Sequence, residues 1–83
     1  MVDLPEQFML ADKQWVPLEI GTRLFNYYDM VPCTITRLPT RTEPDTSGIM
    51  PDGIAWWVDT DTGSLDGSRM ITLDTARTKG WYA

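Results

Sequence analysis

The sequence predicts an all-β fold, a small five-stranded barrel formed by residues 21–83, with an N-terminal segment, residues 1–20, packed on it and a short helical turn near its C-terminus. Apolar and polar residues alternate in short segments after Gly21, after Pro32 and from position 55, as in strands with one buried face. Turn residues separate these segments. A chain of 83 residues, 42% of them hydrophobic, can bury one compact core, so we expect one barrel.

The N-terminal segment fits two structures. Asp3 and Glu6 have the spacing of a helix capping box. Four apolar residues recur at helical spacing and would form one stripe facing the barrel: Leu4, Phe8, Ala11 and Trp15. The alternative is a strand pair, residues 8–10 and 15–18, joined by a turn. The sequence leaves the segment either helical or extended, and Pro17 ends any helix.

The first barrel strand follows Gly21. Because successive side chains of a strand point to opposite faces, Leu24 and Asn26 are expected on one face and Phe25 and Tyr27 on the other. The same alternation recurs after Pro32 and within residues 54–58. Together with Ile71, it predicts six side chains that fill the barrel: Leu24, Cys33, Ile35, Trp56, Val58 and Ile71.

Residues 39–53 are rich in proline and poor in large apolar side chains, which predicts a long loop. Long loops inside small domains are either functional or mobile, so this one is a candidate binding element as well as a plain connection.

The third strand is predicted over residues 54–58, with Ile54, Trp56 and Val58 on one face and Trp57 on the other. A hairpin turn at 59–63 follows, since Gly63 stands where a left-handed residue is needed. A second turn at 66–68 and a helical turn within 73–80 complete the fold, and Trp81 is expected to pack back on the barrel.

Charge and residue usage exclude several functions. The net charge is −5 and the seven bases are scattered, which argues against a phosphate-backbone ligand. The single Cys33 cannot form an internal disulfide, and its place in an alternating strand predicts a buried thiol in a reducing compartment. A basic leader and a long apolar run are both missing, so we expect a cytoplasmic protein with no membrane segment.

Without histidine, Ser-His and Cys-His nucleophile pairs cannot form, and a structural zinc site lacks its ligands. Asp61-Thr-Gly-Ser64 matches the signature of aspartic proteases, but too few residues follow it for the rest of that fold, and a hairpin turn is the better interpretation. We therefore predict no catalytic residues, no metal ligands and no cofactor.

Four short pieces resemble landmarks of SH3-like barrels of the Tudor and KOW-like types. They are Gly21–Leu24, Pro32–Ile35, Trp56–Val58 and Asp61–Gly63, spread over about 45 residues. The C-terminal part, from Leu65, is similar to small uncharacterised proteins of phages and other mobile elements. The resemblance implies an SH3-like five-stranded barrel of bacterial, phage or mobile-element origin.

Aromatic residues mark the candidate site. We expect Phe25, Tyr27 and Trp57 on the outer or rim face, with Tyr28 and Asp29 at the end of the first strand. In Tudor-type barrels, aromatics at such places form a cage for methylated lysine or arginine through cation-π attraction. The alternative is that these rings only cover the ends of the barrel.

The sequence thus favours a non-enzymatic interaction module that binds a protein partner through this aromatic and acidic face, with the 39–53 loop as a further contact. One alternative is a homo-oligomer that binds a small molecule in a shared pore, as in the type II dihydrofolate reductases, although their pore-lining segment has no counterpart here. Another is an acidic anti-defence inhibitor that acts against a basic host site.

Overall fold

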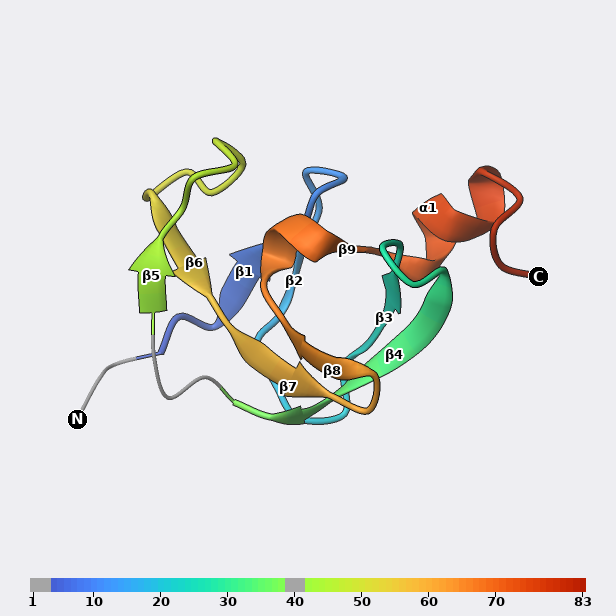
Figure 1. Ribbon diagram of the computed structural model, residues 1–83, viewed down its shortest axis with the longest axis horizontal. Coiled ribbons are helices and arrows are strands. Elements are labelled where there is room, and N and C mark those ends of the chain that lie inside the picture. Colours follow the sequence, from blue (N-terminus) through green and yellow to red (C-terminus); the bar gives the residue numbers. More distant parts are fainter. Residues whose placement is uncertain (1–3, 39–41) are drawn as a thin grey trace.

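A computed structural model describes residues 4–38 and 42–83 and shows an all-β fold in which a curled five-stranded sheet forms a half-barrel (Figure 1). The strands lie in the antiparallel order β8-β7-β4-β3-β9. Their bounds are β3 (Arg23–Asn26), β4 (Val31–Arg37), β7 (Val58–Thr60), β8 (Gly63–Leu65) and β9 (Met70–Ile71). The prediction of an all-β small barrel is confirmed.

The N-terminal segment is extended and forms an antiparallel hairpin of β1 (Gln7–Met9) and β2 (Trp15–Pro17). Phe8 and Val16 lie opposite each other and are both buried, as strand alternation requires. A helical stripe would have buried Trp15 as well, yet 52% of its surface is exposed. The strand-pair alternative is confirmed, and the helix is wrong.

This hairpin is joined to the far end of the chain. The backbone N–H of Ala11 donates to the carbonyl of Met70 at 3.0 Å. The Asp12 carboxylate accepts from both the backbone N–H and the hydroxyl of Thr72, each at 2.9 Å, directly before the helix α1 (Leu73–Thr78). Burial raises the pKa of Asp12, but these and neighbouring hydrogen bonds outweigh it, so that the pKa lies below its usual value.

Two apolar clusters fill the fold. The larger joins the curled sheet to the β1–β2 hairpin and includes Leu24, Cys33 and Val58. The smaller lies against α1 and contains Phe25, Ile71 and Ala76, with further apolar side chains packed around it. All six side chains predicted to fill the barrel are buried: Leu24, Cys33, Ile35, Trp56, Val58 and Ile71. Four of them share the larger cluster, but the predicted common interior is wrong for Ile71, which pairs with Phe25 and belongs to the smaller cluster.

The prediction of a loop over residues 39–53 is wrong for residues 42–44, which form a strand. Residues 39–41 lie outside the described residues, but β5 (Thr42–Pro44) pairs with β6 (Ile54–Trp56) in a second hairpin. Proline is tolerated there because β5 is an edge strand. The connection at its tip is held by the Asp45 carboxylate, which accepts from Ser47 and from the backbone N–H of Met50.

The chain leaves the strand geometry at Trp57, between β6 and β7. A single strand over 54–58 was expected to place Ile54 on the same face as Trp56. Ala55 and Trp56 are both buried, whereas Ile54 is 37% exposed. Ile54 and Trp56 lie two residues apart within β6 and so share a face as predicted, but Ile54 is not covered and the strand ends before Trp57.

The remaining elements agree with the sequence. Gly63 closes the β7–β8 turn with a φ of 126°, and the short 3₁₀ helix η1 (Gly67–Arg69) leads into β9. Gly80 follows α1 with a left-handed φ of 78°. The Trp81 ring then stacks on the Phe25 ring, with 6.4 Å between centroids.

Gly67 is buried where η1 contacts β1. A Cβ atom at this position would overlap the carbonyl oxygen of Met9 and would lie 2.8 Å from the terminal methyl of Met50. Only glycine fits this site without displacing the backbone of β1.

Candidate functional site

A buried asparagine fixes the turn that follows β3. The Asn26 side chain is fully buried, and its Nδ2 donates to the Asp29 carboxylate at 3.1 Å and to the Thr62 hydroxyl at 3.2 Å. Its Oδ1 accepts from the backbone N–H groups of Tyr28 and Asp29. Tyr28 and Asp29 are therefore held on the surface in a defined position.

Arg69, on η1, lies over two of the aromatic rings. Its guanidinium carbon is 4.6 Å from the centroid of the Trp57 ring and 5.6 Å from that of Tyr28. The same guanidinium forms a 2.9 Å ion pair with Asp66, which is only 5% exposed. A buried carboxylate thus holds the arginine against the rings.

Tyr27 contacts both η1 and Tyr28 and so helps to hold this arrangement in place. Its hydroxyl donates to the carbonyl of Ser68 at 2.7 Å, and its ring meets Tyr28 edge-on with 5.0 Å between centroids. Burial raises the pKa of the Tyr27 hydroxyl, which is protonated at neutral pH even at its ordinary pKa and therefore acts as a donor. We call these side chains the Arg69 cluster: Tyr27, Tyr28, Trp57, Asp66 and Arg69.

Three of the five predicted site residues, Tyr27, Tyr28 and Trp57, belong to the Arg69 cluster, and Asp29 is an exposed neighbour of Tyr28. Phe25 is different, because it is fully buried beneath the C-terminal residues. The prediction that Phe25 lies on the outer or rim face is wrong, because α1 and the C-terminal residues cover its face of β3.

Two cluster members were not predicted from the sequence. Asp66 and Arg69 are separated by three positions at η1, a spacing that allows an ion pair within one turn. That spacing was the available signal, but it does not show which aromatic rings the arginine covers.

The cluster differs from an open cage for a methylated lysine. A cation-π cage needs a space between its rings for the incoming cation. Here the chain's own Arg69 occupies the rings of Tyr28 and Trp57. The arrangement therefore presents a mixed surface of arginine and aromatic edges.

A hollow of about 130 Å³ adjoins the cluster. Trp57, Asp66 and Arg69 line one side, and residues 43–47 of the β5–β6 hairpin line the other. The hollow is polar and carries several carboxylates, so it adds negative charge beside the aromatic rings.

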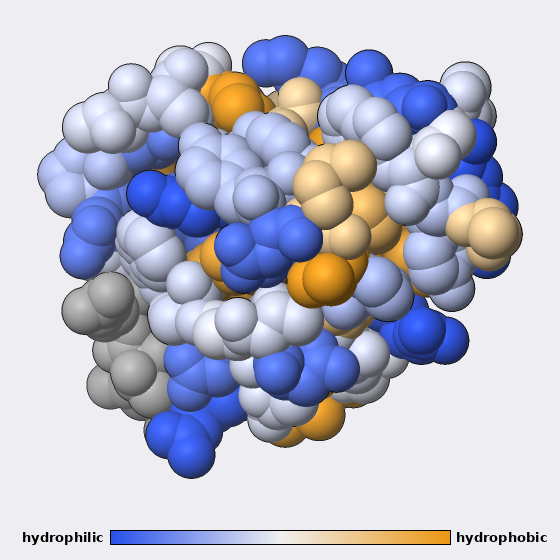
Figure 2. All heavy atoms as spheres, turned by 45° about the vertical axis from the view of Figure 1, so that its right-hand side comes forward, coloured by the Kyte–Doolittle hydropathy of each residue, from blue (hydrophilic) through white to orange (hydrophobic). Residues whose placement is uncertain are grey.

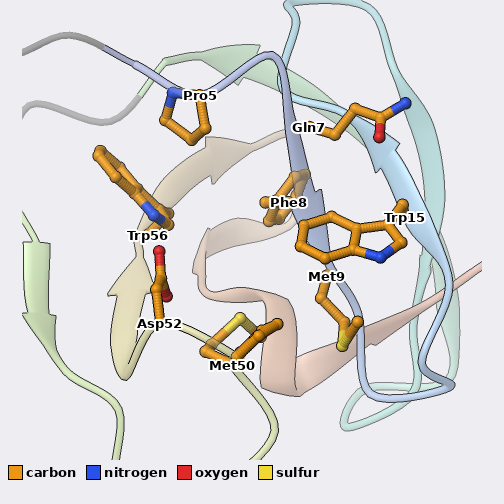
Figure 3. A pocket seen from close by; sticks show the side chains of 9 residues that line it. Pro5, Gln7, Phe8, Met9, Trp15, Met50, Asp52 and Trp56 are labelled. Carbon is orange, nitrogen blue, oxygen red and sulfur yellow. The ribbon is translucent and has the colours of Figure 1, made fainter.

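A second hollow lies between the β1–β2 hairpin and the tip of the β5–β6 hairpin (Figure 3). Its lining is mostly apolar and comprises Pro5, Gln7, Phe8, Met9, Trp15, Met50, Pro51, Asp52 and Trp56. It shares no lining residue with the hollow beside the Arg69 cluster. On the face seen in Figure 2, hydrophobic groups form small areas separated by hydrophilic side chains.

The described residues offer little for metal or thiol chemistry. Within residues 4–38 and 42–83, acidic and cysteine side chains form no group of three that could hold a metal ion. The Cys33 thiol is buried and donates to the sulfur of Met70 at 3.9 Å. Burial, with a smaller contribution from Asp61, raises the pKa of Cys33 to about 11.

Comparison with protein-family models, with curated proteins and with solved structures finds no match to this chain. Among the helices of the described residues, none has the length and apolar character needed to cross a membrane.

Proposed function

We propose that this protein is a non-enzymatic interaction module that binds a protein partner through the Arg69 cluster together with Asp29. The observation that carries the proposal is the Arg69 guanidinium resting on the rings of Tyr28 and Trp57. Tyrosine, tryptophan and arginine are the residue types most enriched among the energetic hot spots of protein interfaces. Tyr28 is 62% exposed, so a partner can reach it directly.

The cluster is also ordered before binding. Arginine normally loses rotamer freedom when an interface forms, at a cost of about 0.5–1.5 kcal/mol for each immobilised side chain. The ion pair with Asp66 and the contacts with both rings already restrict Arg69. A partner would therefore meet a surface that needs little rearrangement.

The charge around the cluster favours a basic partner. Asp29 is exposed beside Tyr28, and Glu43 and Asp45 line the adjoining hollow. The whole chain carries a net charge of −5, which adds a long-range attraction for basic proteins. Binding through this face should weaken as salt concentration rises.

The proposal includes the SH3-like resemblance and the bacterial, phage or mobile-element origin that it implies. A curled five-stranded sheet in which a short 3₁₀ helix joins the last two strands is compatible with such a barrel. A reducing cytoplasmic compartment is part of the same prediction, and the buried Cys33 thiol is compatible with it.

Affinity capture with the tagged full-length chain tests the binding surface. Tyr28→Ala removes an exposed ring, and Arg69→Lys keeps the ion pair with Asp66 but loses the planar group that lies on the rings. We expect each variant to weaken binding to a captured protein by about tenfold or more. Ile20→Ala is the matched control, because Ile20 is 65% exposed and lies outside the cluster.

A partner retained equally by the Tyr28 and Arg69 variants would refute this surface. Solution mass separates the alternatives. A stable oligomer that binds a nicotinamide or folate ligand would support the shared-pore alternative. A monomer whose capture of a basic protein falls steeply with salt would favour the acidic-inhibitor form of the proposal.

A further inference from the structure

We propose a second docking surface, separate from the Arg69 cluster. The groove between the β1–β2 hairpin and the tip of the β5–β6 hairpin binds a protein segment that presents an apolar side chain flanked by lysine or arginine. It shares no residue with the Arg69 cluster and does not depend on the function proposed for that cluster.

The groove has an apolar floor and apolar walls. Phe8 and Trp56 are buried to 2% and 8% exposure and form the floor. Met9, Trp15 and Met50 line the walls, and Figure 3 shows these side chains around a common space. The volume is about 130 Å³. Cavities of about 150 Å³ accept molecules as large as benzene, so one aliphatic side chain can enter.

Trp15 is not needed for the core. It lies opposite Met9 in the hairpin, both side chains line the groove, and Trp15 belongs to neither apolar cluster. The residue is 52% exposed, so much of its large ring is open to a partner. Burying that surface against a partner would contribute at about 25 cal/mol per Å² of apolar area.

The charges around the groove select a basic occupant. Asp52 stands on the rim, with one oxygen accepting from the backbone N–H of Ile54. An adjoining open hollow of about 500 Å³ shares Pro5 and Gln7 with the groove and adds Glu6 and Glu19. Among the described residues that line these two hollows, there is no lysine or arginine.

Other occupants fit less well. A symmetric dimer through this face would bring two acidic rims together with no lysine or arginine among the described lining residues of the two hollows, and like charges across an interface are unfavourable. Phosphate groups of nucleic acids or anionic lipids would meet the same repulsion. A basic and apolar protein segment satisfies both the floor and the rim.

Selection from a displayed library of random peptides on the immobilised full-length chain tests the proposal. We expect the selected peptides to combine an apolar residue with neighbouring lysine or arginine. One selected peptide is then synthesised, and its affinity is measured by fluorescence anisotropy against the wild type and five variants.

Trp15→Ala should lower the affinity for this peptide about tenfold or more. Asp52→Asn keeps an oxygen for the Ile54 amide and removes only the charge. Glu6→Gln likewise removes one negative charge, from the adjoining hollow. Each of these two variants should lower the affinity for the peptide about two- to fivefold at low salt, and its affinity should equal that of the wild type at high salt. Ile20→Ala is the control and should bind like the wild type.

Thermal unfolding of each variant checks that the fold is kept. Selected peptides without basic residues, selection of no peptide at all, or equal binding by Trp15→Ala would each overturn the proposal. Self-association that Trp15→Ala abolishes would also overturn it and would assign the groove to a second copy of the chain. If Tyr28→Ala, and not Trp15→Ala, weakens binding of the selected peptide, the peptide binds at the Arg69 cluster instead.

Discussion

Replacing Asn26 by alanine should destabilise the protein strongly. The side chain is fully buried and makes four hydrogen bonds of 3.1–3.2 Å, two as donor and two as acceptor. A typical intramolecular hydrogen bond contributes about 0.5–1.5 kcal/mol net, and the partners here are only partly buried, so the loss should be about 2–4 kcal/mol. For a chain of this length, that corresponds to a fall in melting temperature of about 10–25 °C.

Urea unfolding followed by tryptophan fluorescence measures this loss. Thr62→Val provides a matched comparison, because it removes one of the four bonds, together with a contact to the Thr60 hydroxyl, and keeps the shape of the side chain. We expect it to lose about 1–2 kcal/mol. The reasoning is refuted if Asn26→Ala loses under 1 kcal/mol, or if Thr62→Val is equally damaging.

Three further predictions concern stability and reactivity. Gly67→Ala should destabilise the protein by about 1–3 kcal/mol in urea unfolding, because the added methyl overlaps the Met9 carbonyl, and an unchanged midpoint would contradict that packing. The lowered pKa of Asp12 contributes stability that is present above its unfolded pKa and is lost as pH falls through the folded value. Asp12→Asn should therefore have a lower free energy of unfolding than the wild type near neutral pH, and this difference should become smaller in acid. A difference that does not change with pH would contradict the prediction. Cys33, with a pKa of about 11, should react with a thiol reagent slowly in the native protein and fully in denaturant, and equal rates would show that it is accessible.

Much of the fold could be predicted from local patterns. The alternation around Cys33 and Ile35 gave the buried face of β4, and Gly63 gave the β7–β8 turn, because both depend on residues close in sequence. β5 was missed because its three residues are all exposed and end in proline, so no alternation marks it.

The candidate site was predicted less completely. Alternation assigns Phe25 to a face of β3, but it does not show that α1 and the C-terminal residues cover that face. Arg69 reaches Trp57 and Tyr28 only because η1 brings distant parts of the chain together. Such long-range packing leaves no local signal.

The contact between Asp12 and Thr72 joins positions 60 residues apart. The entropy lost in closing a loop grows only with the logarithm of its length, so this long closure adds little cost once the intervening strands are in place. Its formation requires both the first hairpin and β9, so we expect it to be a late step in folding. Slow amide exchange at Thr72 would accordingly report that the two ends of the domain have locked together.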